Sequence, residues 1–302
     1  MTLVLAFPGM EKLGQSIAGL LAVDLARVDI HRFPDGESLV TLPGQVAGRD
    51  VAFVATLRHP DALALPLRFA ALTAREMGAR SVGLVAPYLA YMRQDHRFAP
   101  GQAVSGPLFA RFLGESFDWL VTADPHLHRI PTLDAIFTIP VRRAGTVRLL
   151  AEWLSANVAN PVLLGPDSES AQWVAEVAGL AGCPFEVLDK KRIGDRDVQL
   201  SAPVSEALRS RTPVLVDDIV SSGRTMIEAI GQLAVMGSPA PICLVIHAVF
   251  AGNAYEDILA SRAARVVSTD SIPHPSNAIA IGPLLAGEMK SLTSPDADRG
   301  KV

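Results

Sequence analysis

Two adjacent carboxylates and a turn of small residues could do chemistry together. Asp217 and Asp218 follow the apolar run 214–216, and the turn 221–225 leads into a segment with helical spacing of its apolar residues. The N–H groups and hydroxyls of such a turn, with the positive end of the helix, can hold a phosphate. The two carboxylates can accept hydrogen bonds from neighbouring sugar hydroxyls. The stretch therefore predicts a site for ribose 5-phosphate.

A simpler interpretation exists for the turn alone. In this alternative a serine of the turn caps the helix, because serine readily accepts the first N–H groups of a helix. The apolar strand and the pair of acids before the turn favour the sugar-phosphate interpretation. The residues that we assign to this site are Asp217, Asp218, Ser221, Ser222, Gly223 and Thr225.

Two further polar segments could hold a nucleotide. Arg93 and Gln94 come just after the apolar strand 81–86, and open α/β sheets bind ligands beyond the ends of their strands. These side chains could bind a phosphate or a base, and a solvated loop is the alternative. The turn 33–37 carries an aromatic residue and two acids, and a plain hairpin is its alternative.

A possible metal-binding pair follows another strand. Asp124 and His126 are two residues apart after the strand 119–123, so they can present an oxygen and a nitrogen toward one ion. A lone histidine is more often structural, but this one stands in a chain that also predicts a phosphate site. The pattern favours Mg²⁺ ligation.

The order of elements indicates an α/β protein of two domains or one large one. The chain has 302 residues, which is ample for a sizeable core. Helical patterns separate most of the apolar runs. The expected strands are 3–7, 38–42, 51–55, 81–86, 119–123, 162–166, 185–188, 214–216, 242–247 and 265–269. The expected helices are 10–21, 62–77, 105–112, 146–156, 225–236 and 255–260.

Charge and composition indicate which binding partners and which compartment the chain suits. The net charge of -4 gives no support for a nucleic-acid or membrane surface, so an anion must be bound by a local site. No uncharged apolar stretch is long enough to span a bilayer, and the first residues do not form a signal peptide. Cys183 and Cys243 have apolar or small neighbours, as reduced thiols of a cytoplasmic protein do.

Several motifs resemble those of a known family. The stretch 213–230 resembles the phosphoribosyl-diphosphate loop that type I phosphoribosyltransferases and phosphoribosyl-diphosphate (PRPP) synthetases share. The segments 87–95 (Pro-Tyr-Leu-Ala-Tyr-Met-Arg-Gln-Asp) and 32–37 (Arg-Phe-Pro-Asp-Gly-Glu) resemble PRPP synthetases alone. At least five motifs occur in the family's order between residues 3 and 289.

The resemblance implies a fold, an activity and partners. It implies two doubly wound domains of the type I phosphoribosyltransferase-like fold, with parallel sheets and the active site between them. The halves would be an ATP-binding half at 1–140 and a half with the ribose-5-phosphate loop at 141–290, followed by a polar tail at 291–302. The implied reaction converts ATP and ribose 5-phosphate to AMP and PRPP with Mg²⁺. The implied state is a homo-oligomer, a dimer or higher.

The resemblance also implies roles for individual residues. Lys190 and Arg192 would be catalytic, and His126 and Asp167 would bind the metal. Glu169 stands where the family usually has glycine, and Ser221 where many members have an acid. Two alternatives are a phosphoribosyltransferase and a catalytically silent regulatory subunit. The residues expected to bind ATP are Phe33, Asp35, Glu37, Arg93 and Gln94.

We expect Lys190→Ala and Arg192→Ala to fold normally, keep near-normal KM values and lose about two to three decades of kcat. Both cations lie in the charged run 189–197, which can hardly pack in the free enzyme, so their role comes with substrate bound. They stabilise charge that develops as the diphosphate moves. Steady-state kinetics of each variant measures the loss.

Lys191→Ala is the matched control, because it removes the neighbouring cation of the same run. It should have a mild effect. A damaging Lys191→Ala beside a silent Lys190→Ala would show that the loop is assigned in the wrong register.

Overall fold

A computed structural model of the chain describes residues 1–167, 170–188, 208 and 210–293. Within these residues the chain divides into two compact units. The first contains Met1–Gly145 together with the C-terminal helix after Ile281, and the second contains Thr146–Ala280. Each unit has its own parallel sheet, with one apolar core cluster in the first unit and two in the second among the described residues.

A six-stranded parallel sheet in the order β2-β1-β5-β6-β7-β8 forms the centre of the first unit. Both faces of the sheet are covered, so its inner strands are almost continuous apolar runs. The strands are β1 (Thr2–Ala6), β2 (Asp24–Arg27), β5 (Asp50–Val54), β6 (Ser81–Ala86), β7 (Trp119–Ala123) and β8 (Val141–Ala144).

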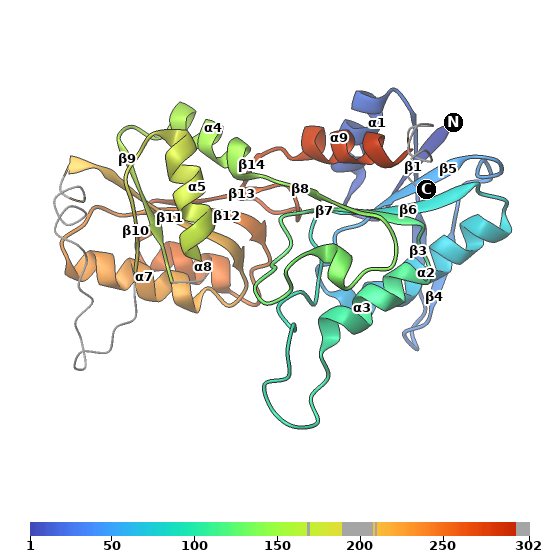
Figure 1. Cartoon of the computed structure of the whole chain (residues 1–302), viewed down its shortest axis with the longest axis horizontal. Coiled ribbons are helices and arrows are strands. Elements are labelled where there is room, and N and C mark those ends of the chain that lie inside the picture. The colour runs from blue at the N-terminus through green and yellow to red at the C-terminus, as the bar shows by residue number, and fades with distance from the viewer. Residues whose placement is uncertain (168–169, 189–207, 209, 294–302) are drawn as a thin grey trace. The chain divides into compact units, whose positions relative to one another are not determined.

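Helices cover the two faces of this sheet. Helices α1 (Glu11–Leu21) and α9 (Gly282–Thr293) lie on one face, and α2 (Pro60–Glu76) and α3 (Ser105–Gly114) lie on the other (Figure 1). Helix α9 approaches α1 closely because Gly282 has no side chain: a Cβ there would lie 3.1 Å from the Cβ of Ser16. A short 3₁₀ helix, η1 (Leu133–Ala135), follows β7.

A separate antiparallel hairpin stands beside this sheet. It consists of β3 (Asp29–Arg32) and β4 (Ser38–Thr41), in which Arg32 pairs with Ser38. Strand β4 contacts α2, so the hairpin belongs to the first unit.

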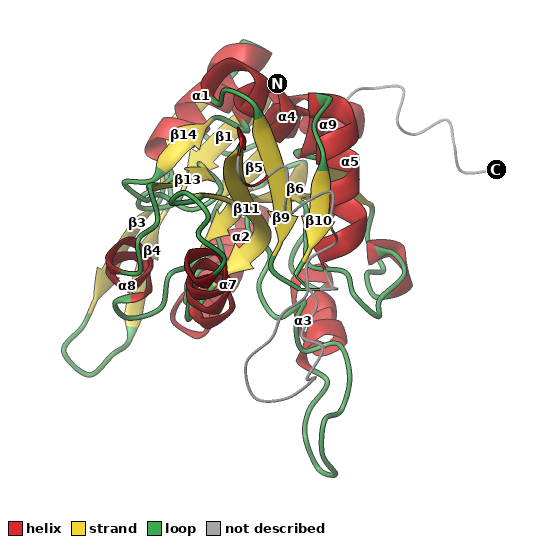
Figure 2. Ribbon diagram, turned by 90° about the vertical axis from the view of Figure 1, so that its left-hand side faces the viewer, coloured by secondary structure: helices red, strands yellow, loops and turns green. Residues whose placement is uncertain are grey.

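The second unit repeats the design with the strand order β10-β9-β11-β12-β13-β14. Helices α4 (Val147–Asn157) and α5 (Ala171–Ala181) pack together, as do α7 (Arg224–Val235) and α8 (Ala254–Ala260). Figure 2 shows the strands between α7 and α8 on one side and α5 on the other. The strands are β9 (Pro161–Gly165), β10 (Phe185–Val187), β11 (Thr212–Val220), β12 (Ile242–Ala248), β13 (Arg265–Thr269) and β14 (Asn277–Ile279).

Alternating side chains of these strands supply two cores. Leu163 and Val214 pack with residues of α4 and α5, whereas Val162 and Leu215 pack with residues of α7 and α8. Successive side chains of a strand point to opposite faces, so a continuous apolar run can fill both cores at once.

The two parallel sheets confirm the expected fold class. The division of the chain differs from the expected one at 140 and 290. Strand β8 pairs with β7 and helix α9 packs on α1, so both belong to the first unit. Strand β11 is also longer than expected and includes Asp217 and Asp218.

Two expectations from composition can be compared with the structure. Among the residues described, none of the helices combines the length and the apolar composition that a membrane span needs. Cys183 and Cys243 are both free thiols, although Cys183 is only half-buried. Burial raises the pKa of Cys243 to about 12, so this thiol stays protonated at neutral pH.

We expect Gly83→Ala to lower the free energy of unfolding by about 1–3 kcal/mol or more, because it overpacks the sheet. Gly83 pairs with Trp119 across β6 and β7, and a Cβ at Gly83 would fall inside the indole ring. Chemical denaturation measures the change.

Gly19→Ala is the matched control, since Gly19 is an exposed residue of α1 with open space around its Cα. It should stabilise the protein by roughly 0.5–1 kcal/mol, the difference between alanine and glycine in a helix. Equal effects of the two substitutions would contradict this account of the sheet.

Candidate nucleotide and sugar-phosphate sites

The turn between β11 and α7 depends on one glycine. Gly223 occupies the N-cap position of α7 with φ +73°, a conformation that other residues rarely adopt. A Cβ at this position would lie 3.1 Å from Ile258 Cδ1 and 3.4 Å from the carbonyl oxygen of Ala254. Both the backbone angle and the surrounding space therefore require glycine.

No side chain of the described residues caps helix α7. The alternative in which a serine of the turn caps the helix is therefore wrong. The first backbone hydrogen bond of the helix runs from Ile227 N–H to the carbonyl of Gly223 at 2.9 Å. The N–H groups before Ile227 have no side-chain cap. The helix thus presents its first N–H groups and its positive end at the turn, which is the arrangement that holds a phosphate.

Backbone hydrogen bonds from a neighbouring loop fix the start of this turn. Phe250 N–H donates to the carbonyl of Val220, and Ala251 N–H donates to the carbonyl of Ser221, both at 2.9 Å. The loop that supplies these donors follows β12, so the ends of two adjacent strands hold the turn. Ser222 is exposed, and Ser221 and Thr225 are half-buried.

The two acids of this site lie in the last part of β11 and are half-buried. Asp217 Oδ1 accepts a hydrogen bond from the backbone N–H of Asp218 at 3.0 Å. They therefore lie toward the carboxyl edge of the second sheet, a few residues before the turn 221–225.

Asp167 lies at the same edge of the second sheet. Strands β9 and β11 are neighbours, but the chain leaves β9 toward β10 and leaves β11 toward β12, so their connections diverge. Ligands of open α/β sheets bind where connections diverge in this way. Asp167 follows β9, is half-buried, and accepts a hydrogen bond from Ser170 N–H at 3.3 Å through Oδ1. The next two residues, including Glu169, lie outside the described residues.

In the first unit, the hairpin turn presents an aromatic ring to solvent. Phe33 N–H donates to the carbonyl of Glu37, and Gly36 N–H donates to the carbonyl of Phe33, both at 2.9 Å. Asp35 Oδ1 accepts a hydrogen bond from Glu37 N–H at 3.1 Å. The Phe33 side chain is 42% exposed and meets His31 edge-on, with ring centroids 4.7 Å apart. The turn 33–37 is therefore the turn of a hairpin, and it places Phe33 at the surface.

The loop after β6 exposes both residues expected to bind a nucleotide. Arg93 and Gln94 have exposed side chains, while the backbone of Gln94 is hydrogen-bonded through both its N–H and its carbonyl group. Gln94 N–H donates to the carbonyl of Tyr91 at 2.9 Å, and Gly106 N–H donates to the carbonyl of Gln94 at 3.1 Å. The hydroxyl of Tyr91 donates to Asp61 on α2, and this hydrogen bond, together with burial, raises the pKa of Tyr91 to about 12.

The loop after β7 carries the expected metal-binding histidine. His126 is half-buried and His128 is exposed, and their rings are nearly parallel with centroids 6.1 Å apart. Asp124 is buried with φ +25°, and its Oδ1 accepts hydrogen bonds from Arg143 Nε and Nη2 at 2.9 and 2.7 Å. The acid of the Asp-x-His pair is therefore ion-paired with strand β8.

Sequence patterns included Asp95 in the segment 87–95 but missed its pairing with Arg129. Asp95 and Arg129 form an ion pair between the loops after β6 and β7. The only signal in the sequence was the position of Asp95 beside Arg93 and Gln94. Lys190 and Arg192, the two expected catalytic residues, lie outside the described residues.

Comparison with known proteins decides the family. Residues 2–116 match the N-terminal domain of ribose phosphate pyrophosphokinase, and residues 134–280 match a phosphoribosyl transferase domain. The ribose-phosphate pyrophosphokinase of Methanopyrus kandleri is 34% identical over 294 residues, which cover 96% of this chain and 99% of that protein. The chain belongs to the ribose-phosphate pyrophosphokinase family.

Other members of the ribose-phosphate pyrophosphokinase family agree. The protein of that name from Methanothermobacter thermautotrophicus is 30% identical and aligned over 95% of this chain and 100% of its own length. The crystal structure of phosphoribosylpyrophosphate synthetase from Mycobacterium smegmatis has the same fold. Its TM-score is 0.83 at 22% identity, over 96% of this chain and 98% of that one. The match to residues 2–116 separates the chain from a phosphoribosyltransferase that has only the second domain.

We expect Phe33→Ala to raise the KM for ATP about tenfold, because stacking of a base on an aromatic ring contributes about 1–3 kcal/mol. The KM for ribose 5-phosphate should stay nearly unchanged. Steady-state kinetics with each substrate varied in turn measures both. Leu39→Ala, which truncates an exposed apolar residue of the same hairpin, is the matched control. Equal changes for both substrates, or loss of folding, would instead show that Phe33 is structural.

Proposed function

We propose that this protein transfers the diphosphoryl group of ATP to the 1-hydroxyl of ribose 5-phosphate, which yields AMP and PRPP. The observation that carries the proposal is the similarity to ribose-phosphate pyrophosphokinases over 96% of the chain, which includes both of the family's domains. The turn at Gly223 also supports the proposal, because the uncapped N–H groups at the start of α7 can bind the phosphate of the sugar.

The sugar phosphate binds at the carboxyl edge of the second sheet. The N–H groups at the start of α7 and the hydroxyls of Ser221, Ser222 and Thr225 hold the 5-phosphate. Asp217 and Asp218 accept hydrogen bonds from the ribose hydroxyls. The support for this assignment is the position of both acids at the end of β11 and the accessibility of the turn.

The nucleotide binds to residues of the first unit. Phe33 stacks on adenine, Asp35 and Glu37 accept hydrogen bonds near it, and Arg93 and Gln94 bind phosphate or base. All five side chains are exposed, whereas the backbone of both segments is held by internal hydrogen bonds. Preorganised backbone with exposed polar side chains is the arrangement that a binding loop requires.

Magnesium is the proposed cofactor, and the proposed metal-binding residues are His126 in the first unit and Asp167 in the second unit. No group of three or more histidines, cysteines and acids among the described residues forms a ready cage for a metal. Mg²⁺ is usually held by one or two protein side chains together with substrate phosphates, so it requires few ligands from the protein. When bound, the ion neutralises part of the triphosphate charge.

The reaction requires orientation and charge stabilisation more than covalent catalysis. The 1-hydroxyl oxygen of the sugar forms a bond to the β-phosphorus and loses its proton to solvent. The bond between the β-phosphorus and the oxygen that it shares with the α-phosphorus breaks, and AMP leaves with that oxygen. Lys190 and Arg192 stabilise the charge that develops on the diphosphate.

A homo-oligomer is the proposed state, and the cytoplasm is the proposed location. Helix α2 exposes Leu65, Phe69 and Leu72, whose spacing places them on one face of the helix. An exposed apolar stripe of this kind suits contact with a second copy. The two free thiols suit a reducing compartment.

We expect the purified protein, given ATP, Mg²⁺ and ribose 5-phosphate, to form AMP and PRPP in equal amounts and no ADP. Separation of the nucleotides and of the labelled sugar phosphates measures the products. Ribose without its phosphate is the matched control and should not react, because the turn at Gly223 then has no anion to bind.

Three other outcomes would contradict the proposal. Formation of ADP would indicate transfer of the γ-phosphoryl group. Turnover only with PRPP and a free base would indicate a phosphoribosyltransferase. No turnover of a folded protein that binds ATP would indicate a silent regulatory subunit.

A further inference from the structure

We propose that Asp95 is a positioning residue that, through Arg129, holds the loop carrying Arg93 and Gln94 against the loop carrying His126. The proposal rests on the proposed function, in which these loops bind the nucleotide and the metal. It assigns a role to the third residue of the segment 93–95, whose first two side chains are exposed while the third is not.

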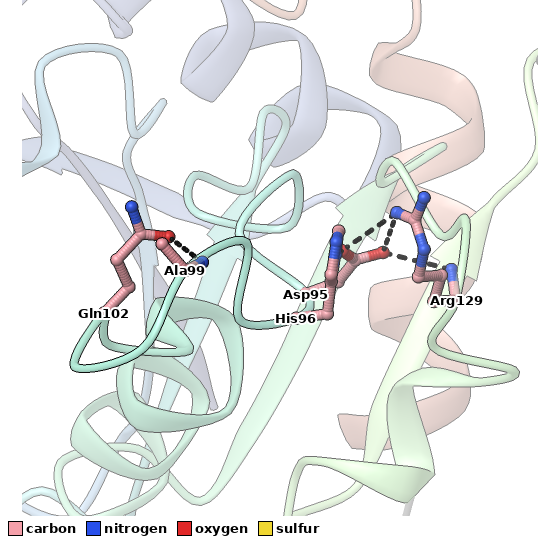
Figure 3. A network of polar contacts seen from close by, with 5 residues as sticks. All are labelled: Asp95, His96, Ala99, Gln102 and Arg129. Carbon is pink, nitrogen blue, oxygen red and sulfur yellow. Dashed lines mark hydrogen bonds and ion pairs between the residues drawn. The ribbon is translucent and has the colours of Figure 1, made fainter.

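Both oxygens of Asp95 are engaged by neighbouring groups (Figure 3). Oδ2 accepts a hydrogen bond from the backbone N–H of Arg129 at 3.1 Å, and Arg129 Nη1 lies 3.3 and 3.4 Å from the two oxygens. Oδ1 is also 2.8 Å from His96 Nδ1. One carboxylate thus joins two loops whose residues are 34 positions apart in the sequence.

The side chain of Asp95 is too buried to contact a ligand directly. Its side chain is 1% exposed, whereas that of Arg129 is 50% exposed. Burial of the carboxyl group raises its pKa, but the hydrogen bonds from His96 and Arg129 outweigh burial and leave the pKa of Asp95 below its usual value. Asp95 therefore stays ionised as an internal partner of Arg129, and its oxygens face protein groups.

The contact acts close to the functional side chains on both loops. Asp95 follows Gln94 directly, and Arg129 is three residues after His126. Helix α3 contacts both loops at this place. Gly106 N–H donates to the carbonyl of Gln94, and Ile130 lies beside Gly106. Loss of the ion pair would release the first loop from the second while leaving α3 in place. The expected consequence is a looser nucleotide site in a folded protein.

The test uses Asp95→Asn, Arg129→Gln and the double variant in the full-length protein. Each single substitution should raise the KM for MgATP about tenfold, the effect of losing one charged hydrogen-bonding pair. The KM for ribose 5-phosphate should change less than about twofold, because that substrate binds through the second unit. The double variant should be no worse than the more affected single variant, because both act through one contact.

Arg111→Gln is the matched control, since it removes one exposed positive charge from α3 in the same unit. It should leave both KM values unchanged. Dissociation constants for a fluorescent ATP analogue provide a second measurement that needs no turnover. A failed reaction of the wild-type protein would therefore count against the proposed function, while the binding data would still test the ion pair.

Three results would overturn the proposal. A large loss of kcat in Asp95→Asn beside a normal Arg129→Gln would mean that Asp95 acts directly on substrate or metal. A lower unfolding midpoint in both variants with unchanged binding of the analogue would mean that the contact is only structural. Additive effects in the double variant would mean that the two residues act independently.

Discussion

Within the described residues, every strand pair in the two six-stranded sheets is parallel. All strands of a sheet then end at the same edge, and the loops that leave this edge gather there. In the first unit these loops carry Arg93 and His126, and in the second they carry Asp167 and the turn after β11. Parallel pairing also buries both faces of each sheet, so polar groups are confined to its ends.

The candidate sites of the two units are ordered by different means. In the second unit the backbone conformation shapes the turn, because Gly223 lets the chain pass from strand to helix while the N-terminus of the helix stays uncapped. In the first unit side chains order the loops. Asp95 binds Arg129, and Asp124 binds Arg143. A phosphate can be held by the N–H groups and the dipole of one helix N-terminus, whereas a nucleotide is larger and needs several loops that are held in fixed positions.

Local patterns predicted much of the fold and the strand ends after which several candidate site residues lie. Buried strands are apolar runs, and the turn 33–37 has the proline, aspartate and glycine of a hairpin. Partners distant in the chain left no such pattern: Asp95 and Arg129 are 34 residues apart, and Asp124 and Arg143 are 19 apart. The same reason explains why the structure divides the chain differently from the predicted boundary at 290, since only the packing of α9 on α1 places this helix in the first unit.

The central claim is that the start of α7 binds the phosphate of ribose 5-phosphate. Calorimetric titration with ribose 5-phosphate tests it on the wild-type protein, on Gly223→Ala and on Gly231→Ala. Gly231 lies in the same helix with open space around it, so its variant is the control. We predict that Gly223→Ala weakens binding about tenfold or more, while Gly231→Ala does not. Unchanged affinity of a folded Gly223→Ala variant would contradict the account.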